Sequence, residues 1–527
     1  MNLKNQILKA LKNNPPPPIR INLTKRNVMT PEINLTSPIK YSITDSLVVD
    51  INPTQNFTNL LFEVDRYAGG GHDPATIEGV AATTYATIVQ SLNGSATLFE
   101  LPKKWASVSS LKVFPFAGRG LNAYYNRKHL AFFYDQNKRT QKWFFTSACP
   151  EIVAHELGHA MLDALRPDLW NAASLEVWAF HEAFGDIASM LSLMQHPEII
   201  KQIIKDTNGD IRKHNIASDI AENFSAILIA NGYESQDGYL RSGINDFKYE
   251  DPQFLPSSGV LGTLTKQPHS FSQVFFGTAY DLLVMFYEEN LKSMDAETAL
   301  ALARDTLATY MIKAVRNAPA SVRFFESVCK TLLWADFNWG SRFHERMTQI
   351  FSNRNIIYYE LSALSLGDLT GAIHNQGEGM MIVCKSKHDK LCNCSKKMKI
   401  QNHNPMNNIN LSILRTDAYI HDKQGRLIDV HKVSESLTLS AAEDMLKYLE
   451  ENEAISDEPT TPFEISNGSL QRTLICCCGE KPLKSSPEYN KQYKPENNSG
   501  CCGGCKKTEK KVIKKKIKKS CFVRYKI

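Results

Sequence analysis

The segment that decides the fold is Pro150-Glu-Ile-Val-Ala-His155-Glu156-Leu-Gly-His159-Ala-Met-Leu-Asp163. Pro150 suits the first turn of a helix, because that turn does not use its backbone N–H, and Arg166-Pro167 is expected to stop the helix. His155 and His159 are four residues apart, so both imidazoles project from one face of the helix. Two neutral imidazoles at this spacing can hold one Zn²⁺, with Glu156 beside the open coordination position. The alternative is a helix with two surface histidines.

A third ligand is expected from the next helix, which begins after Ser174 and contains His181-Glu182-Ala-Phe-Gly-Asp186. Glu182 and Asp186 share one face of an otherwise apolar helix, where two carboxylates repel each other unless a positive group lies near them. A metal bound by Glu182, with Asp186 accepting the free N–H of a liganding imidazole, removes that conflict. The alternative is a partly exposed acidic stripe.

These two helices resemble those of the thermolysin-like zinc metallopeptidases (gluzincins), in which an HExxH helix is followed by a helix with an ExxxD pair. The similarity covers roughly residues 75–355 and includes three further elements. These are Leu121-Asn122-Ala123-Tyr124-Tyr125 on an expected edge strand, Leu240-Arg241-Ser242, and Pro268-His269-Ser-Phe-Ser272 at the start of a helix.

The resemblance implies one catalytic Zn²⁺ and a role for each matching residue. Glu156 would be the general base and would later pass its proton to the leaving amine. The other implied roles are zinc ligation by His155, His159 and Glu182, orientation of His155 by Asp186, oxyanion stabilisation by His269, binding of a substrate carbonyl by Arg241, and binding of the extended peptide by Asn122 and Ala123. Alternatives remain for two of them: His269 as a loop histidine packed by Phe271, and Arg241 as a solvated or salt-bridged side chain.

The sequence also departs from the family pattern. Trp170 stands where the family usually has a tyrosine that assists the oxyanion, although its indole N–H is still a donor. The second helix continues without the carboxylates of the usual calcium site, so no family-type Ca²⁺ site is expected. Ile152 and Leu240 match positions of the family's primed-side pocket, and both are apolar. A bulky hydrophobic residue after the scissile bond is therefore implied.

The expected fold class is α+β: a two-lobed thermolysin-like zincin with a β-rich N-terminal lobe and a helical C-terminal lobe. A small α+β C-terminal domain and a disordered tail are expected to follow. The expected boundaries are an N-terminal arm at 1–40, the strand-rich lobe at 41–149, the helical lobe at 150–356, the small domain at 357–475 and a Cys/Lys-rich tail at 476–527. Locally, we expect a helix over 75–92, a hairpin from 412–421 and 426–433, and a helix capped by Ser440.

The formal net charge of +6 over 527 residues belongs to the tail. Residues 506–527 hold 11 Lys and Arg against one Glu, and the remainder holds 50 basic against 54 acidic residues. The sequence therefore does not favour a nucleic-acid-binding body, and the tail has too few aromatic residues for specific nucleic-acid recognition. Contact with an anionic membrane through this tail is left open. Ten of the twelve cysteines lie at or beyond Cys384, where they could bind a structural zinc, be lipidated or be free.

The N-terminus has no continuous apolar segment of the kind found in secretory signals, so a cytoplasmic location is expected, with non-classical export left open. The function expected from the resemblance is a zinc-dependent endopeptidase acting on a peptide or protein substrate. The alternative is a catalytically weak or inactive zincin-fold binding protein whose C-terminal region docks a partner or a membrane. The oligomeric state is left open.

Overall fold

The computed structural model describes residues 39–44, 47–51, 58, 60–67, 77–96, 102–233, 235, 238–338, 340–357, 381–383, 396–400, 409–414, 417–421, 427–432, 435–452, 454–455 and 461–476. The described part is mixed α and β, as the coarse fold class predicted. Nearly all of the N-terminal arm, the tail beyond 476 and Cys384, Cys392 and Cys394 fall outside the described residues, so the predictions for them remain predictions.

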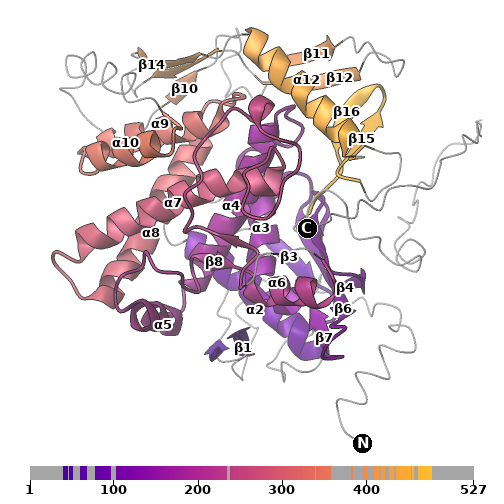
Figure 1. The fold of residues 1–527 in the computed structure, drawn as a ribbon, viewed down its shortest axis with the longest axis vertical. Coiled ribbons are helices and arrows are strands. Elements are labelled where there is room, and N and C mark those ends of the chain that lie inside the picture. The colour runs from indigo at the N-terminus through magenta and orange to yellow at the C-terminus, as the bar shows by residue number, and fades with distance from the viewer. Residues whose placement is uncertain are drawn as a thin grey trace, which may run out of the picture.

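The N-terminal half is built on a mixed sheet with the strand order β17-β5-β6-β4-β3, and β7 pairs with β6 (Figure 1). Strands β3, β4 and β6 are parallel neighbours, whereas β5 runs antiparallel to β6. The elements of this half are β1 (Ile39–Thr44), β2 (Leu47–Ile51), β3 (Leu61–Val64), α2 (Ile77–Ala96), β4 (Ser110–Arg119), β5 (Ala123–Tyr125), β6 (His129–Gln136) and β7 (Trp143–Phe145).

The helical half packs around α3 and α4, which contact each other along their lengths. Helix α3 also contacts α2 and β5, while α4 contacts α7, so the two helices join the strand-rich and helical parts. The elements of this half are α3 (Pro150–Leu165), α4 (Leu175–Leu193), α5 (Pro197–Thr207), β8 (Asp219–Ile220), α6 (Glu222–Ala230), β9 (Arg241–Ser242), α7 (Pro268–Asn290), α8 (Ala296–Asn317), α9 (Phe324–Asn338) and α10 (His344–Asn353).

The described residues of the C-terminal region form two small sheets and the helix α12. One sheet has the order β11-β12-β16-β15 and the other the order β10-β13-β14. The elements are β10 (Met381–Val383), β11 (Lys396–Ile400), β12 (Ile409–Ile413), β13 (Asp417–His421), β14 (Leu427–Lys432), α12 (Glu435–Glu451), β15 (Phe463–Ser466), β16 (Ser469–Arg472) and β17 (Ile475–Cys476). Strand β17 leaves this region and joins the N-terminal sheet by pairing with β5. The prediction of an edge strand at 121–125 is therefore wrong, because β5 lies between β17 and β6.

The local predictions are correct where short-range signals act alone. Helix α3 begins at Pro150 and ends before Arg166, and Ser174 caps α4 by accepting a hydrogen bond from Val177 N at 3.3 Å. The predicted hairpin is present as β13 and β14, although its first strand begins at Asp417 because residues 409–413 form the separate strand β12.

Two predicted helix boundaries are wrong. Helix α2 continues through Gly94 to Ala96, where a Cβ at Gly94 would meet the flexible end of the Gln195 side chain at 2.6 Å. Helix α12 begins at Glu435, five residues before Ser440, which therefore lies inside the helix and does not cap it. Its apolar face, including Leu446 and Leu449, packs in the C-terminal core.

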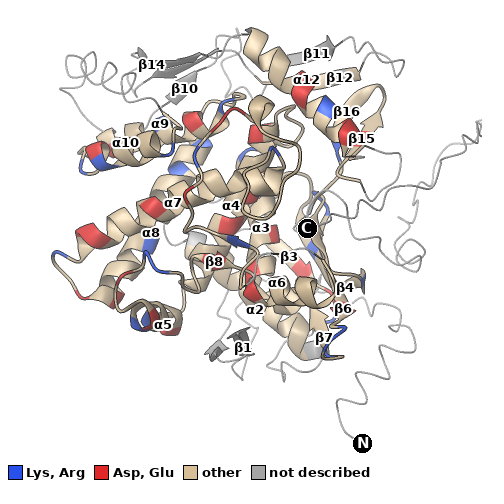
Figure 2. Ribbon diagram, viewed as in Figure 1, with Lys and Arg blue, Asp and Glu red and all other residues tan. Residues whose placement is uncertain are grey.

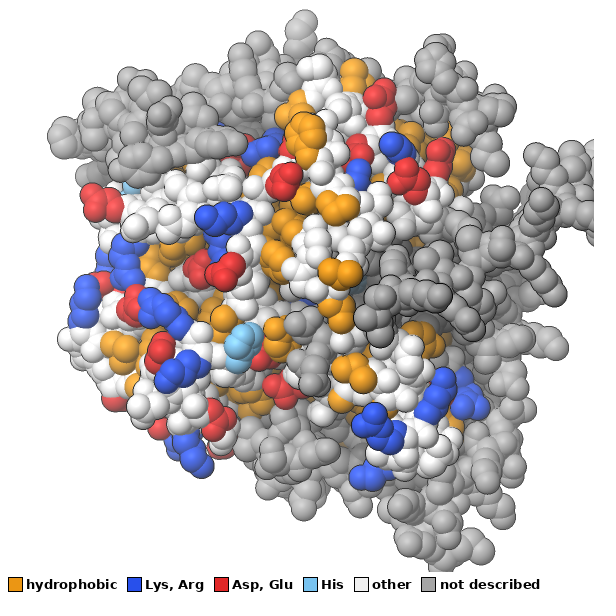
Figure 3. Space-filling model, in the orientation of Figure 1, with side chains coloured by type: hydrophobic (Ala, Val, Ile, Leu, Met, Phe, Trp, Pro, Cys, Tyr) orange, Lys and Arg blue, Asp and Glu red, His pale blue; other side chains and the backbone are white. Residues whose placement is uncertain are grey.

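Charged side chains of both signs are interspersed along the described helices (Figure 2). Apolar side chains gather along the middle of the face shown in Figure 3. The most exposed large apolar side chains of the described residues are on the loop before α7, where Phe254 is 72% and Val260 is 76% exposed. Among the described residues, no helix combines the length and apolar character needed to cross a bilayer.

Candidate metal centre

The centre is built on the buried face of α3. His155, Glu156 and His159 are each at most 2% exposed, and one potential ligand atom from each lies within 4.8 Å of those of the other two. These three residues form a group that could hold a metal ion, as the spacing of the motif predicts. The two imidazole rings are nearly perpendicular, with their centroids 4.6 Å apart.

A close approach of α3 and α4 brings the second helix to these histidines. A Cβ built on Gly158 would lie 3.0 Å from Gly185 Cα, and a Cβ built on Gly185 would lie 2.7 Å from the His155 imidazole. Neither glycine needs a left-handed backbone; each is required because a side chain would occupy space already filled. The glycine pair therefore sets the position of α4 relative to the His155 ring.

Glu182 of α4 lies where the histidines converge. Its Oε2 is 3.3 Å from His155 Nε2 and 3.8 Å from His159 Nε2. His269, in the first turn of α7, approaches the same oxygen with its Nε2 at 3.0 Å. Side chains from three helices thus meet at one carboxylate, and the structure brings together the sequence-predicted residues His155, His159, Glu182 and His269.

Asp186 fixes the orientation of His155. Its Oδ1 lies 2.9 Å from His155 Nδ1, and Arg241 donates to Oδ2 through Nε and to Oδ1 through Nη2, both at 2.7 Å. A carboxylate in this position accepts a hydrogen bond from His155 Nδ1–H, which leaves the lone pair of His155 on Nε2, facing Glu182 and His159. Asp186 therefore stabilises the tautomer of His155 that a metal ligand needs.

The proton affinities of the buried groups differ strongly. Burial alone would lower the pKa of His155, but the carboxylates of Asp186 and Glu182 raise this pKa to about 9. Burial lowers the pKa of His159 to about 3, so this imidazole is neutral at pH 7. For Asp186, burial opposes ionisation, yet Arg241 and His155 bring the pKa down to about 2. At pH 7 the metal-free centre therefore holds two ionised carboxylates, a protonated His155 and a neutral His159, and a cation at His155 Nε2 would take the place of a proton.

The donor atoms of this centre fit a cation. Four polar atoms of the centre are buried and make no hydrogen bond with the described residues. They are Nδ1 and Nε2 of His159 and both carboxylate oxygens of Glu182. Buried polar atoms of this kind are costly unless another group satisfies them. Coordination of a metal ion by His159 Nε2, His155 Nε2 and Glu182 would supply that group, because imidazole and carboxylate are common ligands of divalent zinc-like ions.

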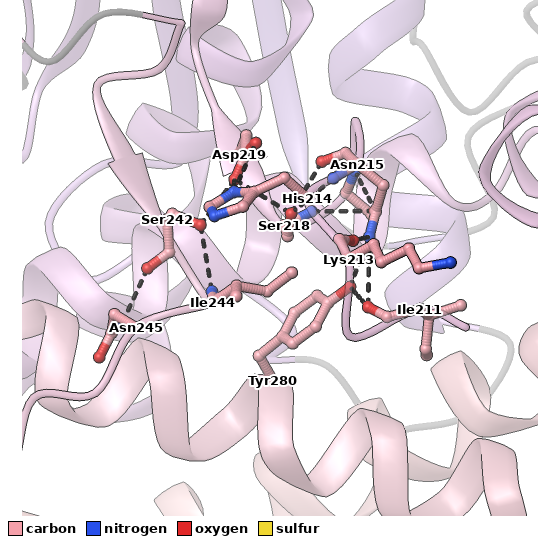
Figure 4. A network of polar contacts seen from close by, with 11 residues as sticks. Ile211, Lys213, His214, Asn215, Ser218, Asp219, Ser242, Ile244, Asn245 and Tyr280 are labelled. Carbon is pink, nitrogen blue, oxygen red and sulfur yellow. Dashed lines mark hydrogen bonds and ion pairs between the residues drawn. The ribbon is translucent and has the colours of Figure 1, made fainter. Parts of the chain in front are cut away.

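A polar network surrounds Ser242, the neighbour of Arg241 in the chain (Figure 4). Both residues lie on β9, and Ser242 donates to Asp219 Oδ1 at 2.6 Å across the β8–β9 ladder. Asp219 also accepts from Ser218 Oγ at 3.0 Å and pairs with His214 Nδ1 at 2.8 Å. The network anchors the short ladder on α7 through Tyr280, whose hydroxyl donates to Ile211 O. Arg241 is therefore positioned by its backbone as well as by Asp186.

The remaining predicted residues lie on the strand side of α3. Ala123 begins β5 and pairs with Phe132 of β6, while the side chain of the buried Asn122 accepts a hydrogen bond from Ala123 N at 2.8 Å. Trp170 is buried against Tyr125, and its Nε1–H donates to Arg472 O at 3.1 Å. In this structure the Trp170 donor is therefore bonded to the C-terminal region.

Sequence reasoning assigned no role to three other groups beside the centre. His181 is fully buried between Trp170 and His159, and burial holds its pKa well below the usual value. Asp163, one turn beyond His159, accepts hydrogen bonds from Arg127 and from Tyr125. Arg472 comes from β16, about 300 residues away in the chain. The position of His181 next to Glu182 was a usable signal, whereas no local pattern pointed to Arg472.

Comparisons of this chain with models of known protein families and with characterised proteins find no match.

Proposed function

We propose that this chain is a zinc-dependent endopeptidase of the thermolysin-like (gluzincin) type. The proposal is supported above all by the convergence of His155, His159 and His269 on Glu182, because these residues come from three separate helices. A helix with two surface histidines would not bury Glu156 and a distant carboxylate in the same place. The ligands of the ion would be His155, His159 and Glu182.

Zinc bound there supplies Lewis acidity, which polarises a peptide carbonyl and makes water a better nucleophile near pH 7. Glu156 is fully buried beside the two histidines and would remove a proton from the attacking water. The water oxygen would first form a C–O bond to the carbonyl carbon, and the C–N bond would then break as Glu156 passes the proton to the leaving amine. His269 would donate a hydrogen bond to the carbonyl oxygen as negative charge develops on it.

Substrate position would be set by the elements on either side of α3. An extended peptide can bind to the edge of a strand through backbone hydrogen bonds, and β5, which follows Asn122 and contacts α3, would offer such an edge on the side where β17 now pairs with it. Arg241, held by Asp186 on the other side, would bind a substrate carbonyl. The apolar side chains of Ile152 and Leu240 favour a bulky hydrophobic residue after the scissile bond.

One observation favours the alternative of a weakly active or inactive binding protein. The metal ligands and Glu156 are almost completely buried, and the edge of β5 is already paired with β17. A centre built for turnover must admit a peptide. The retained Glu156 argues for catalysis, because a zinc site with a purely structural role needs no buried general base beside it.

The test combines zinc content with cleavage of a broad peptide library by the full chain. We expect one zinc per chain, loss of zinc on His159→Ala or Glu182→Ala, and retention of zinc with loss of cleavage on Glu156→Gln. Glu151→Gln is the matched control, because Glu151 is equally buried on α3 but accepts its hydrogen bond from Ala221 N, away from the histidines. Cleavage that survives Glu156→Gln would refute the proposed chemistry.

A further inference from the structure

The edge of β5 has an occupant from this same chain. Strand β5 pairs with β6 on one side and antiparallel with β17 on the other, where Ile475 faces Tyr125 and Cys476 faces Tyr124. A strand has two edges, so both edges of Tyr124 and Tyr125 are in use. A peptide substrate cannot pair with these residues while β17 remains in place.

Just before β17, the backbone N–H and the backbone carbonyl of Arg472 both make hydrogen bonds to side chains. Its N–H donates to Asn171 Oδ1 at 3.0 Å, and its carbonyl oxygen accepts from Trp170 Nε1 at 3.1 Å. Asn171 and Trp170 lie in the connection between α3 and α4, which carry the candidate metal ligands. The catalytic half therefore binds a backbone unit of the C-terminal region through side chains, as a peptide-binding site binds its ligand.

The side chain of Arg472 is enclosed beside the metal centre. Its guanidinium carbon lies 5.1 Å from the ring centroid of Trp178 and 5.7 Å from that of Trp170, and Phe463 covers a third side at 5.0 Å. The buried guanidinium makes no hydrogen bond to the described residues. Burial lowers the pKa of Arg472 to about 9, and the nearby carboxylates of Glu182 and Asp163 act in the opposite direction and favour its positive charge. An aromatic pocket with negative charge behind it is suited to a cationic side chain.

The C-terminal region also shares a hydrophobic core with the catalytic half. Trp178 and Leu175 of α4 pack with Phe463 and Leu470 of the C-terminal sheet, and Ala173 N donates to Ser412 O at 2.9 Å. Helix α12 covers the far side of this core (Figure 1). The segment that pairs with β5 is therefore held in place by a C-terminal region that packs against α4.

We propose that residues 472–476, with Arg472 in the pocket of Trp170 and Trp178 and with Ile475 and Cys476 paired to β5, are a tethered, substrate-like occupant of the peptide-binding edge, and that the enzyme is latent until this segment leaves. The inference rests on the proposed peptidase function. It explains why a centre with a general base and metal ligands is closed to solvent. It also identifies the pocket of Trp170 and Trp178 as a binding site for an arginine-containing peptide, with Arg472 as its present ligand.

The test releases the segment in the full-length, zinc-loaded chain. Ile475 is 1% exposed, so Ile475→Asp places a charge where none can be solvated and should detach β17. The matched control is Gln471→Asp, which adds the same charge at an exposed position of β16. If the open form of the wild type is about one-tenth populated, kcat/KM for peptides rises about tenfold in Ile475→Asp and is unchanged in the control.

Release is measured separately from activity, by hydrogen exchange of the Tyr125 amide, which faces β17 because the backbone polar groups of Asn122 and Asn126 face β6. A synthetic peptide of residues 469–476 should inhibit the Ile475→Asp chain in trans and restore protection of that amide, and the same peptide with Arg472→Ala should inhibit less. Arg472→Ala in the full chain is the second variant, with partial activation expected, should Ile475→Asp impair folding.

The outcomes separate the two proposals. If the wild type and a chain with an unprotected Tyr125 amide cleave peptides equally, and both depend on Glu156, the latency is overturned and the peptidase function stands. Failure of the 469–476 peptide to inhibit a released, active chain would also overturn it. Absence of cleavage by every zinc-loaded chain, including the released one, would overturn the peptidase function and the latency with it.

Discussion

Asp186 offers the most informative substitution, because one carboxylate serves both His155 and Arg241. In Asp186→Asn the side chain keeps a single acceptor oxygen. If that oxygen faces Arg241, the amide NH₂ faces His155 Nδ1, which must then give up its proton. The His155 proton moves to Nε2, the nitrogen directed at Glu182, and blocks metal binding. If the oxygen faces His155 instead, the amide donors face the Arg241 guanidinium.

The two arrangements should change two measurable quantities, the free energy of unfolding and the affinity for zinc. Arg241 is 5% exposed and Asp186 is fully buried, so removing the negative partner of this pair should lower the free energy of unfolding by about 3–5 kcal/mol. Loss of the correct His155 tautomer should weaken zinc binding by about 10–100-fold. The first quantity is measured on the metal-free chain by urea denaturation followed by tryptophan fluorescence. The second is measured by competition for zinc with a chromophoric chelator.

Asp163→Asn is the matched control for this prediction. Asp163 is also fully buried and pairs with Arg127 at 2.6 Å, and its side chain bonds to Arg127 and Tyr125, not to either candidate metal-binding histidine. The control should therefore lose stability and keep its zinc affinity to within a few-fold. If Asp186→Asn and Asp163→Asn change zinc affinity equally, or if Asp186→Asn leaves it unchanged, Asp186 does not orient a metal ligand.

Two further predictions concern the packing of α4. Burial raises the pKa of Glu176 from 4.5 to about 7, so the folded state binds a proton that the unfolded state releases, and stability falls by about 3 kcal/mol as the pH rises from 4.5 to 7. Glu176→Gln should abolish this fall, as urea denaturation at pH 5 and pH 8 would show; an unchanged pH dependence would contradict the assignment. Gly185→Ala should displace the His155 ring, weaken zinc binding and lower the free energy of unfolding by about 1–3 kcal/mol. Gly94→Ala is its control, since the Cβ there meets only the flexible Gln195 side chain, and equal zinc affinities of the two variants would refute the steric argument.

The part of the fold that the sequence predicts is the part governed by short-range signals. Pro150 and Ser174 start α3 and α4 where expected, and the four-residue spacing of His155 and His159 places both rings on one face. Glu182 was expected as their partner because a buried carboxylate in an apolar helix needs a positive group nearby. Its approach to both rings agrees with that expectation.

The part that the sequence does not predict depends on contacts between distant segments. Strand β17 is two residues long, so it has no alternation that could mark it as a strand, and its pairing with β5 joins residues about 350 positions apart. Arg472 looks like an ordinary polar residue of a short strand, and only the packing of Phe463 against Trp178 shows that it is enclosed. Gly94 resembles a residue that ends a helix. The Gln195 side chain that packs against it is remote in sequence, so the sequence does not show this contact.

The central claim is that the buried His-Glu cluster is a catalytic zinc centre. The most direct test is a crystal structure of the zinc-loaded chain, with the metal located by its anomalous signal at the zinc absorption edge. We expect one peak about 2.0–2.2 Å from His155 Nε2, His159 Nε2 and a carboxylate oxygen of Glu182. A zinc ion held only by the C-terminal cysteines, with no peak between the two histidines, would contradict it.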